Sequence, residues 1–166
     1  MTGGASSWSF REEDSRQIET VLAGFLRESN ARTALIVDRT GQLVATVGEP
    51  PTFDPTAFAS LTAADFSAND QLARMLGEPE FGALFHQGER ESMYLADVAR
   101  RVILVVLFDN RTTLGLVKLR VKGAVGELNR VFTAMFDGGA AARPRPEVES
   151  GFVGDAEDEI DKLFGA

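Results

Sequence analysis

The chain has 166 residues, 44% of them hydrophobic, which is the size of one domain with a single core. It contains no cysteine and one histidine, His86, which excludes disulfides, thiol nucleophiles and metal sites that need two imidazole ligands. The formal net charge of −8 has the wrong sign for binding phosphate-rich surfaces, so nucleic acid and anionic membranes are poor candidates as partners.

Most of this acidity lies at the C-terminal end. Residues 137–166 carry eight acidic and three basic residues, hence −5 of the total charge, and such a run is usually solvated. The first ten residues lack the basic and apolar regions of a signal peptide, and the longest strongly apolar run, 102–108, is too short to span a bilayer. We therefore expect a cytoplasmic protein.

The first predicted elements are a helix and a hairpin. Residues 10–29 place Ile18, Leu22 and Phe25 at helical spacing, and three acids open the segment, where the helix dipole favours negative charge. Two apolar runs, 33–37 and 42–47, flank the four residues DRTG, a glycine-containing connection typical of a hairpin. These runs predict two antiparallel strands.

A second helix is predicted for residues 55–76, with Asp54 as its N-cap and Gly77 at its end. Its larger apolar side chains share one face, which we assign to the core: Leu61, Ala68, Leu72, Met75 and Leu76, flanked by Phe58. The opposite face is small, polar and aromatic: Ala59, Ala63, Phe66, Ser67, Asp70 and Arg74. Small side chains let a partner approach closely, so this face is a candidate contact surface. Alanine also favours helix by itself, and from this feature alone the two interpretations are about equal.

Three strands and a helix complete the predicted fold. The strands are expected at residues 81–86, 91–98 and 101–108, and the last, apolar on both faces, belongs at the centre of a covered sheet. Apolar residues at spacings of three and four predict a helix over 112–136, with a threonine cap. The order αββαβββα indicates an α/β fold of the α+β sandwich type, a five-stranded antiparallel sheet with helices on both faces.

The predicted domain spans residues 10–136 and follows an N-terminal extension of residues 1–9. Residues 137–154 are rich in Gly, Ala and Pro and are predicted to be a flexible linker. Residues 155–166 form an acidic tail in which Ile160, Leu163 and Phe164 have helical spacing. A segment this short does not form a stable isolated helix. The three apolar residues therefore either make no contact or fold as a helix against a partner, and we favour docking on a partner.

The sequence carries no signature of catalysis. It has no phosphate-binding glycine loop, no dinucleotide-binding fingerprint and no nucleophile elbow. No second histidine or cysteine accompanies His86, which we expect to be a packed or surface residue, and the acids of 155–161 lack the ligand spacing of an EF hand. The residues therefore indicate a non-catalytic interaction protein without a metal or cofactor.

Several segments together resemble bacterial roadblock/light-chain-7 proteins of the MglB type. The strongest are the hairpin LIVDRTGQL at 35–43 and, above all, LVVLFDNRTTLGLVKLR at 104–120. The likeness continues in shorter stretches: ASLTA at 59–63, GEPEF at 77–81, FHQG at 85–88 and DEIDKLF at 158–164. It covers about residues 10–136 and the tip of the tail.

This resemblance implies a homodimer in which the third strands pair into one continuous sheet and the second helices lie together on one face. It implies a partner, a small Ras-like GTPase of the MglA type that controls cell polarity or motility, whose GTP hydrolysis the dimer accelerates, with the complex expected at a cell pole. Members of the family supply no arginine finger and instead hold the GTPase's own catalytic groups in position. Their tail helix docks on a separate surface of the GTPase and favours nucleotide exchange, a role that falls here on Ile160, Leu163 and Phe164.

The resemblance places the GTPase on the second helix, and the predicted contact residues are Ala59, Ala63, Phe66, Ser67, Asp70, Gln71 and Arg74. One of them departs from the family, whose contact face uses small residues at the positions matching Ser67 and Gln71. Gln71 is long and polar, which works against close approach. The alternative is therefore a roadblock scaffold or adaptor that binds a GTPase or polarity protein without stimulating hydrolysis. An enzyme with its own small-molecule substrate has little in its favour.

Overall fold

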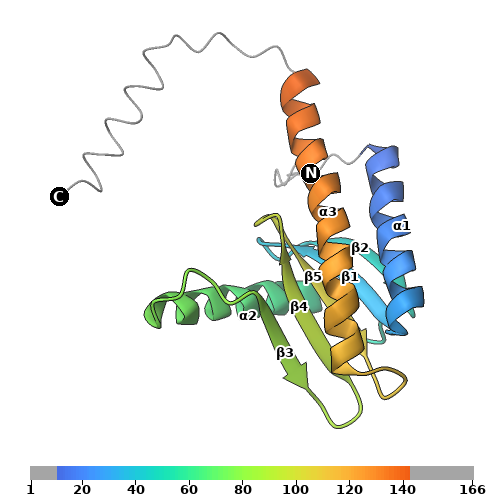
Figure 1. Cartoon of the computed structure of the whole chain (residues 1–166), viewed down its shortest axis with the longest axis vertical. Coiled ribbons are helices and arrows are strands. Elements are labelled where there is room, and N and C mark those ends of the chain that lie inside the picture. The colour runs from blue at the N-terminus through green and yellow to red at the C-terminus, as the bar shows by residue number, and fades with distance from the viewer. Residues whose placement is uncertain (1–10, 143–166) are drawn as a thin grey trace, which may run out of the picture. The chain divides into compact units, whose positions relative to one another are not determined.

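The computed structural model describes residues 11–142, and Figure 1 shows how their helices and strands are arranged. The elements of this part of the chain are α1 (Glu12–Ser29), β1 (Thr33–Asp38), β2 (Leu43–Gly48), α2 (Pro55–Met75), β3 (Ala83–Gln87), β4 (Ser92–Val98), β5 (Val102–Phe108) and α3 (Leu114–Ala142). The predicted order αββαβββα is confirmed. α3 continues beyond its predicted end at residue 136, through a run that closes on three alanines, which favour helix.

The strands form one five-stranded sheet in the order β2-β1-β5-β4-β3, and each neighbouring pair is antiparallel. β5 lies at the centre, as predicted, because its residues are buried on both faces of the sheet. Leu35 of β1 and Leu95 of β4 both pair with Val105 of β5, so these three side chains share one face. β2 and β3 form the two edges.

Helices cover both faces of the sheet, as predicted (Figure 1). α2 packs against the face that carries Leu35, Leu95 and Val105. The alternate residues of the strands face the other way, toward α1 and α3, which lie side by side. Buried side chains from both of these helices complete that second layer of the core: Ile18, Leu22, Phe25, Val117, Val121 and Leu128.

Short polar side chains define the turns and helix starts. In the hairpin between β1 and β2, the Asp38 carboxylate accepts hydrogen bonds from the backbone N–H groups of Thr40 and Gln42, at 3.0 and 2.9 Å. Gly41 follows with φ of +97°, a conformation that a side chain would disfavour. Asp54 caps α2 by accepting from the Thr56 N–H at 3.1 Å, as predicted.

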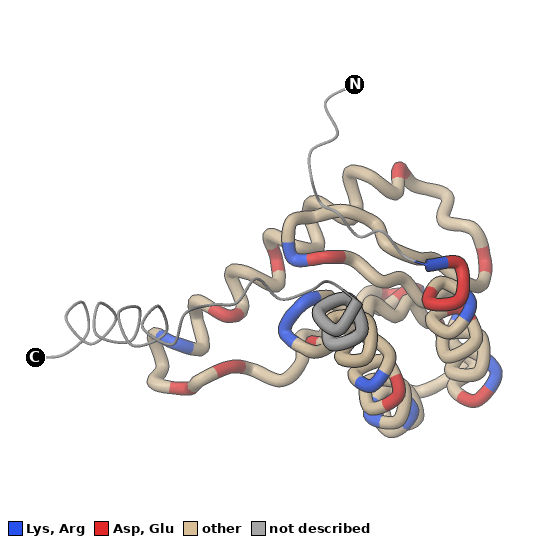
Figure 2. The backbone as a smooth tube through the Cα atoms, turned by 90° about the horizontal axis from the view of Figure 1, so that it is seen from above, with Lys and Arg blue, Asp and Glu red and all other residues tan. Residues whose placement is uncertain are grey.

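The predicted threonine cap of α3 is also present. The Thr113 hydroxyl oxygen accepts a hydrogen bond from the backbone N–H of Leu116 at 3.2 Å. α1 differs, because Arg11 at its N-cap position makes no side-chain cap hydrogen bond. Three acids in the first turn of α1 complement the helix dipole instead, and they form the red segment at the start of that helix in Figure 2.

Candidate interaction surface

The two faces of α2 are the reverse of the sequence prediction. The face toward the sheet is small and polar except for one phenylalanine, and its buried residues are Ala59, Thr62, Ala63, Phe66, Asn69 and Ala73. The predicted core stripe is wrong, because its side chains are exposed: Leu61 to 71%, Leu72 to 55%, Met75 to 82% and Leu76 to 73%, and Ala68 as well. Only the flanking Phe58 packs against the core, and it is partly buried.

The sheet beneath α2 explains the reversal. β1, β4 and β5 present large buried apolar side chains to the helix: Leu35, Val37, Leu95, Ile103 and Val105. Protein interiors are close-packed, so a sheet that supplies this volume leaves space for alanines and a single phenylalanine from the helix. The alanines serve the approach of α2 to its own sheet.

The predicted contact residues therefore divide into two groups. The side chains of Ala59, Ala63 and Phe66 are 0%, 8% and 1% exposed, so they lie in the core and are unavailable to a partner. For these three residues the predicted surface position is wrong. The others lie at the surface, with Asp70 half-buried, and their contact role stays a prediction: Ser67, Asp70, Gln71 and Arg74.

An apolar stripe runs along the outward side of α2. We define this outer stripe as Leu61, Ala64, Ala68, Leu72 and Met75, which follow the three- and four-residue spacing of one helix face. All five residues are exposed. Contiguous apolar surface of this kind marks an interaction site more often than a solvated face.

The outer stripe lies next to an edge of the sheet. Nε2 of His86, on edge strand β3, is 2.6 Å from Oδ2 of Asp65, which lies on α2 one turn after Leu61. Edge strands present unpaired backbone N–H and C=O groups that can pair with another strand. The outer stripe and the β3 edge thus form one candidate surface for association. The sequence contains a signal for this surface, because α2 has two faces that could make contacts, but the sequence prediction places the wrong one of them in the core.

The side of α2 that carries Ser67, Asp70, Gln71 and Arg74 is its polar flank. Arg39 anchors this polar flank to the rest of the fold. Its guanidinium donates to Oδ2 of Asp70 at 2.8 Å and to the carboxylate of Asp97 on β4, and it lies 4.8 Å from the centroid of the Phe66 ring. Burial disfavours the charged guanidinium, but the hydrogen bonds to Asp97 and Asp70 outweigh this and raise the pKa of Arg39 above its ordinary value. Beside it lies a hollow of about 360 Å³, which Ser67 and other residues line.

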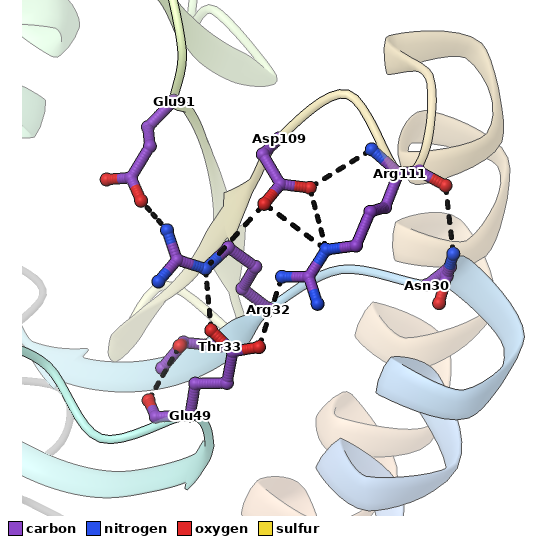
Figure 3. Close-up of polar contacts among 7 residues, drawn as sticks. All are labelled: Asn30, Arg32, Thr33, Glu49, Glu91, Asp109 and Arg111. Atoms are coloured by element: carbon purple, nitrogen blue, oxygen red, sulfur yellow. Dashed lines mark hydrogen bonds and ion pairs between the residues drawn. The ribbon is translucent and has the colours of Figure 1, made fainter.

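The segment DNRTTLG, which carries much of the family resemblance, belongs to an ionic cluster at one end of the sheet (Figure 3). Nε of Arg111 donates to Oδ1 of Asp109 at 3.0 Å, and Nη2 of Arg111 donates to Oε1 of Glu49 at 3.1 Å. Nε of Arg32 donates to the other oxygen of Glu49 at 2.7 Å, and the Arg32 guanidinium also pairs with Glu91. These contacts join the ends of β2 and β5 to the starts of β1 and β4.

The cluster also holds the end of α1. Asn30, which follows α1 with a left-handed φ of 58°, donates from its side-chain amide to the carbonyl oxygen of Arg111 at 2.8 Å. Hydrogen bonds from Arg32 and Arg111 lower the pKa of Glu49, and those from Arg111 lower the pKa of Asp109. The polar residues of this segment therefore stabilise the fold.

The described part of the chain offers few groups for other chemistry. Between residues 11 and 142, His, Asp and Glu form no group of three or more that would hold a metal ion. Over the same range, none of the helices has the length and hydropathy needed to cross a bilayer. The predicted tail-docking residues, Ile160, Leu163 and Phe164, lie outside the described residues.

Comparison with known proteins gives a consistent family. Residues 17–108 match the sequence profile of the Roadblock/LC7 domain. Myxococcus xanthus MglB is 43% identical, with a TM-score of 0.68, over 71% of this chain and 96% of that one.

Two further solved structures are similar over nearly their full length. The gliding protein MglB from Thermus thermophilus is 34% identical, with a TM-score of 0.69, over 74% of this chain and 93% of that one. An MglB with a tetrameric arrangement is 34% identical, with a TM-score of 0.69, over 74% and 92% of the two chains. Proteins of curated function give no match.

Proposed function

The chain belongs to the Roadblock/LC7 domain family, and from this membership we propose that it is a homodimeric regulator of a small Ras-like GTPase of the MglA type. It accelerates GTP hydrolysis by its partner and has no active site of its own. The observation that carries the proposal is the exposed outer stripe of α2 beside the β3 edge, in a chain 43% identical to Myxococcus xanthus MglB. Control of cell polarity or motility is the corresponding role.

Dimer formation is the first step of this proposal. In a dimer with twofold symmetry each copy offers the same surface, so the outer stripe of one copy faces that of the other and the two β3 edges pair. Leu61 and Met75 are 71% and 82% exposed in the single chain. Full burial of a side chain of this kind contributes about 1.5–3 kcal/mol, so a few such residues from each copy supply a substantial driving force.

The dimer step is tested by introducing charge into the outer stripe. Leu72→Asp places a carboxylate on this surface, and we expect the variant to sediment as a folded monomer in analytical ultracentrifugation. The matched control is Leu119→Asp, because Leu119 is a similarly exposed leucine on α3, at 61% against 55%. A variant at position 72 that stayed dimeric would place the interface elsewhere.

The GTPase contact is the second step. The polar flank of α2 borders the outer stripe and exposes Ser67, Gln71 and Arg74. In the proposed dimer, the flanks of the two copies would therefore lie on either side of the interface between the outer stripes. Asp70 shares this flank but its carboxylate is engaged by Arg39, which gives that part of the surface a fixed shape. The tail residues Ile160, Leu163 and Phe164 are proposed as a second docking element.

Hydrolysis is then accelerated by positioning. A rigid α2 surface would hold the mobile switch segments of the GTPase, so that the charge developing on the γ-phosphate is stabilised by the GTPase's own groups. Arg74 is an exposed cation of the polar flank. Its replacement distinguishes a protein that only positions the GTPase's own groups from one that inserts an arginine finger into the GTPase active site. If Arg74 only contributes to binding, Arg74→Ala lowers affinity but leaves the rate at saturation within about threefold, whereas loss of an arginine finger costs about 10³-fold or more.

Phosphate release from a GTP-loaded MglA-like GTPase, with and without this protein, tests the whole proposal. We expect acceleration that saturates with concentration, and a loss of it in Ser67→Arg. The control is Gln17→Arg, the same change at an exposed position of α1, which should behave as the unmodified chain. Absence of any acceleration at saturation would refute GTPase activation.

A scaffold that binds without stimulating hydrolysis is the second candidate, and one observation favours it. Gln71 is exposed on the contact flank, where its length opposes the close approach of a partner. Binding in a pull-down with an unchanged rate of hydrolysis would select the scaffold. In that case Gln71→Ala, which shortens the side chain, should raise the rate.

A further inference from the structure

A groove lies between α3 and the strands β3 and β4. Its floor is formed by Ala83, Tyr94 and Ala96, its wall by Val121 and Val125 of α3, and its volume is about 580 Å³. Tyr94 and Ala96 alternate along β4 with Leu95, which packs beneath α2. Because successive side chains of a strand point to opposite faces, the groove is on the face of the sheet away from α2 and its outer stripe.

Two lysines give this apolar groove a positive rim. Lys118 and Lys122 line it from α3, where they lie one helical turn apart, and both are exposed. Neither forms an ion pair with another residue in the described part of the chain. Both are positive charges in a chain whose net charge is −8. Figure 2 shows α3 almost end-on, with its basic segments in blue.

The other polar groups of the groove do not neutralise this charge. Asp97 also lines it, but its carboxylate is bound by Arg39. Tyr94 is 8% exposed, and burial raises the pKa of its hydroxyl, which therefore stays protonated at neutral pH. That hydroxyl forms no hydrogen bond within residues 11–142. The groove thus combines an apolar floor with two lysines and the Tyr94 hydroxyl, and none of these three polar groups has a partner among residues 11–142.

We propose that this groove binds an acidic amphipathic peptide segment of a partner protein. Apolar side chains of the segment contact Tyr94, Ala96 and Val125, while two of its carboxylates, one helical turn apart, pair with Lys118 and Lys122. The exposed Leu119, between the two lysines in sequence, extends the apolar contact. Charge complementarity favours a peptide over a fatty acid, because two cations a turn apart match two side-chain carboxylates, whereas a fatty acid carries only one.

Binding of a labelled acidic peptide to the full chain tests the proposal. The probe is a synthetic peptide with the sequence of residues 155–166, DAEDEIDKLFGA, which carries carboxylates one turn apart and apolar residues at helical spacing. Measured by fluorescence anisotropy, we expect saturable binding that weakens as salt is raised. The double variant Lys118→Glu and Lys122→Glu should weaken it at least tenfold, about 1.4 kcal/mol.

Two controls make the result decisive. Arg130→Glu reverses a charge at another exposed position of α3 and should change the affinity less than twofold. A peptide with its third and fifth residues changed to Gln and its fourth and seventh to Asn retains one side-chain carboxylate, so it has no carboxylate pair one turn apart and should bind as weakly as the intact peptide binds the double variant. Circular dichroism of each protein variant establishes that the fold is kept.

Three results would overturn the proposal: equal binding to the unmodified chain and the lysine variant, no binding at all, or lysine-dependent binding of dodecanoate without binding of the peptide. The last result would identify an anionic lipid as the occupant. No GTPase is present in these measurements, so failure here leaves the proposed regulation of a GTPase untouched.

Discussion

α1 and α2 pack on opposite faces of one sheet, but they use their large apolar residues in opposite ways. In α1, Ile18, Leu22 and Phe25 are at most 3% exposed, so its apolar stripe completes the core. In α2, Leu61 and Met75 are 71% and 82% exposed, and an alanine-rich face meets the sheet instead. The apolar residues of α1 are therefore buried within the chain, whereas α2 leaves a second apolar surface exposed.

Truncation of the buried residues tests this difference between α1 and α2 most directly. Leu22→Ala in α1 and Phe66→Ala in α2 should each lower the free energy of unfolding by about 3–4 kcal/mol, because both remove fully buried side chains. Urea unfolding, followed by circular dichroism at one fixed protein concentration, measures both. If Phe66→Ala cost less than about 1 kcal/mol, the face of α2 identified as buried would be wrong.

The exposed side of α2 provides the control for this prediction. Leu61→Ala should lower stability only by weakening the proposed dimer, so its effect should disappear as the protein is diluted. The effects of Leu22→Ala and Phe66→Ala should persist on dilution.

The same comparison shows how much of the fold can be predicted from the sequence. The helices, the strands and the central place of β5 follow from local signals such as the Asp54 cap, the DRTG turn and the unbroken apolar run of β5. Turn chemistry and periodicity act over a few residues, so one sequence contains them.

The orientation of α2 does not follow from local signals. The helix has two faces that a sheet could cover, and the choice depends on the volume that Leu35, Leu95 and Val105 supply from strands distant in sequence. Three of the predicted contact residues are exposed, because they lie on the flank where either orientation leaves a helix residue at the surface: Ser67, Gln71 and Arg74. Ala59, Ala63 and Phe66 depended on the orientation and were misplaced with it.

A smaller effect is expected from the ionic contacts of the two helices. Arg39→Ala removes the guanidinium that joins Asp70 of α2 to Asp97 of β4, and should cost about 1–2 kcal/mol, because two partly buried carboxylates lose their partner. Arg16→Ala in α1 is the matched control. Its pair with Glu12 is 73% and 84% exposed, so less than about 0.5 kcal/mol should be lost in the same urea titration. Equal effects would show that Arg39 does not anchor α2.

The two helices also differ at their N-terminal caps. Asp54 caps α2, so Asp54→Ala should lower stability by about 1 kcal/mol. Arg11 gives α1 no such cap, and Arg11→Ser should raise stability by about 0.5 kcal/mol. Thermal unfolding of both variants would move the transition in opposite directions. A shift of the same sign in both would mean that the side chains at these two positions do not act as caps.

The smallest effect concerns the ionic cluster that holds the end of α1. Its carboxylates, Glu49 and Asp109, have pKa values below their ordinary ones, so they stabilise the folded state while ionised. This stabilisation is present above the unfolded pKa values, about 4.3 for Glu and 3.9 for Asp, and is lost as pH falls through the lower folded values. The effect is small because the Glu49 side chain is 45% exposed and solvent screens its contacts.

Replacement of both carboxylates removes this pH dependence. Glu49→Gln combined with Asp109→Asn should be less stable than the unmodified chain at pH 7, and the difference should shrink as the pH falls below about 4. Glu19→Gln, at an exposed position of α1, should show no such convergence. Urea midpoints between pH 7 and pH 2.5 measure the difference. A gap that stayed constant over this range would mean that the cluster holds α1 through packing, and that the end of α1, like its apolar stripe, depends on contacts without charge.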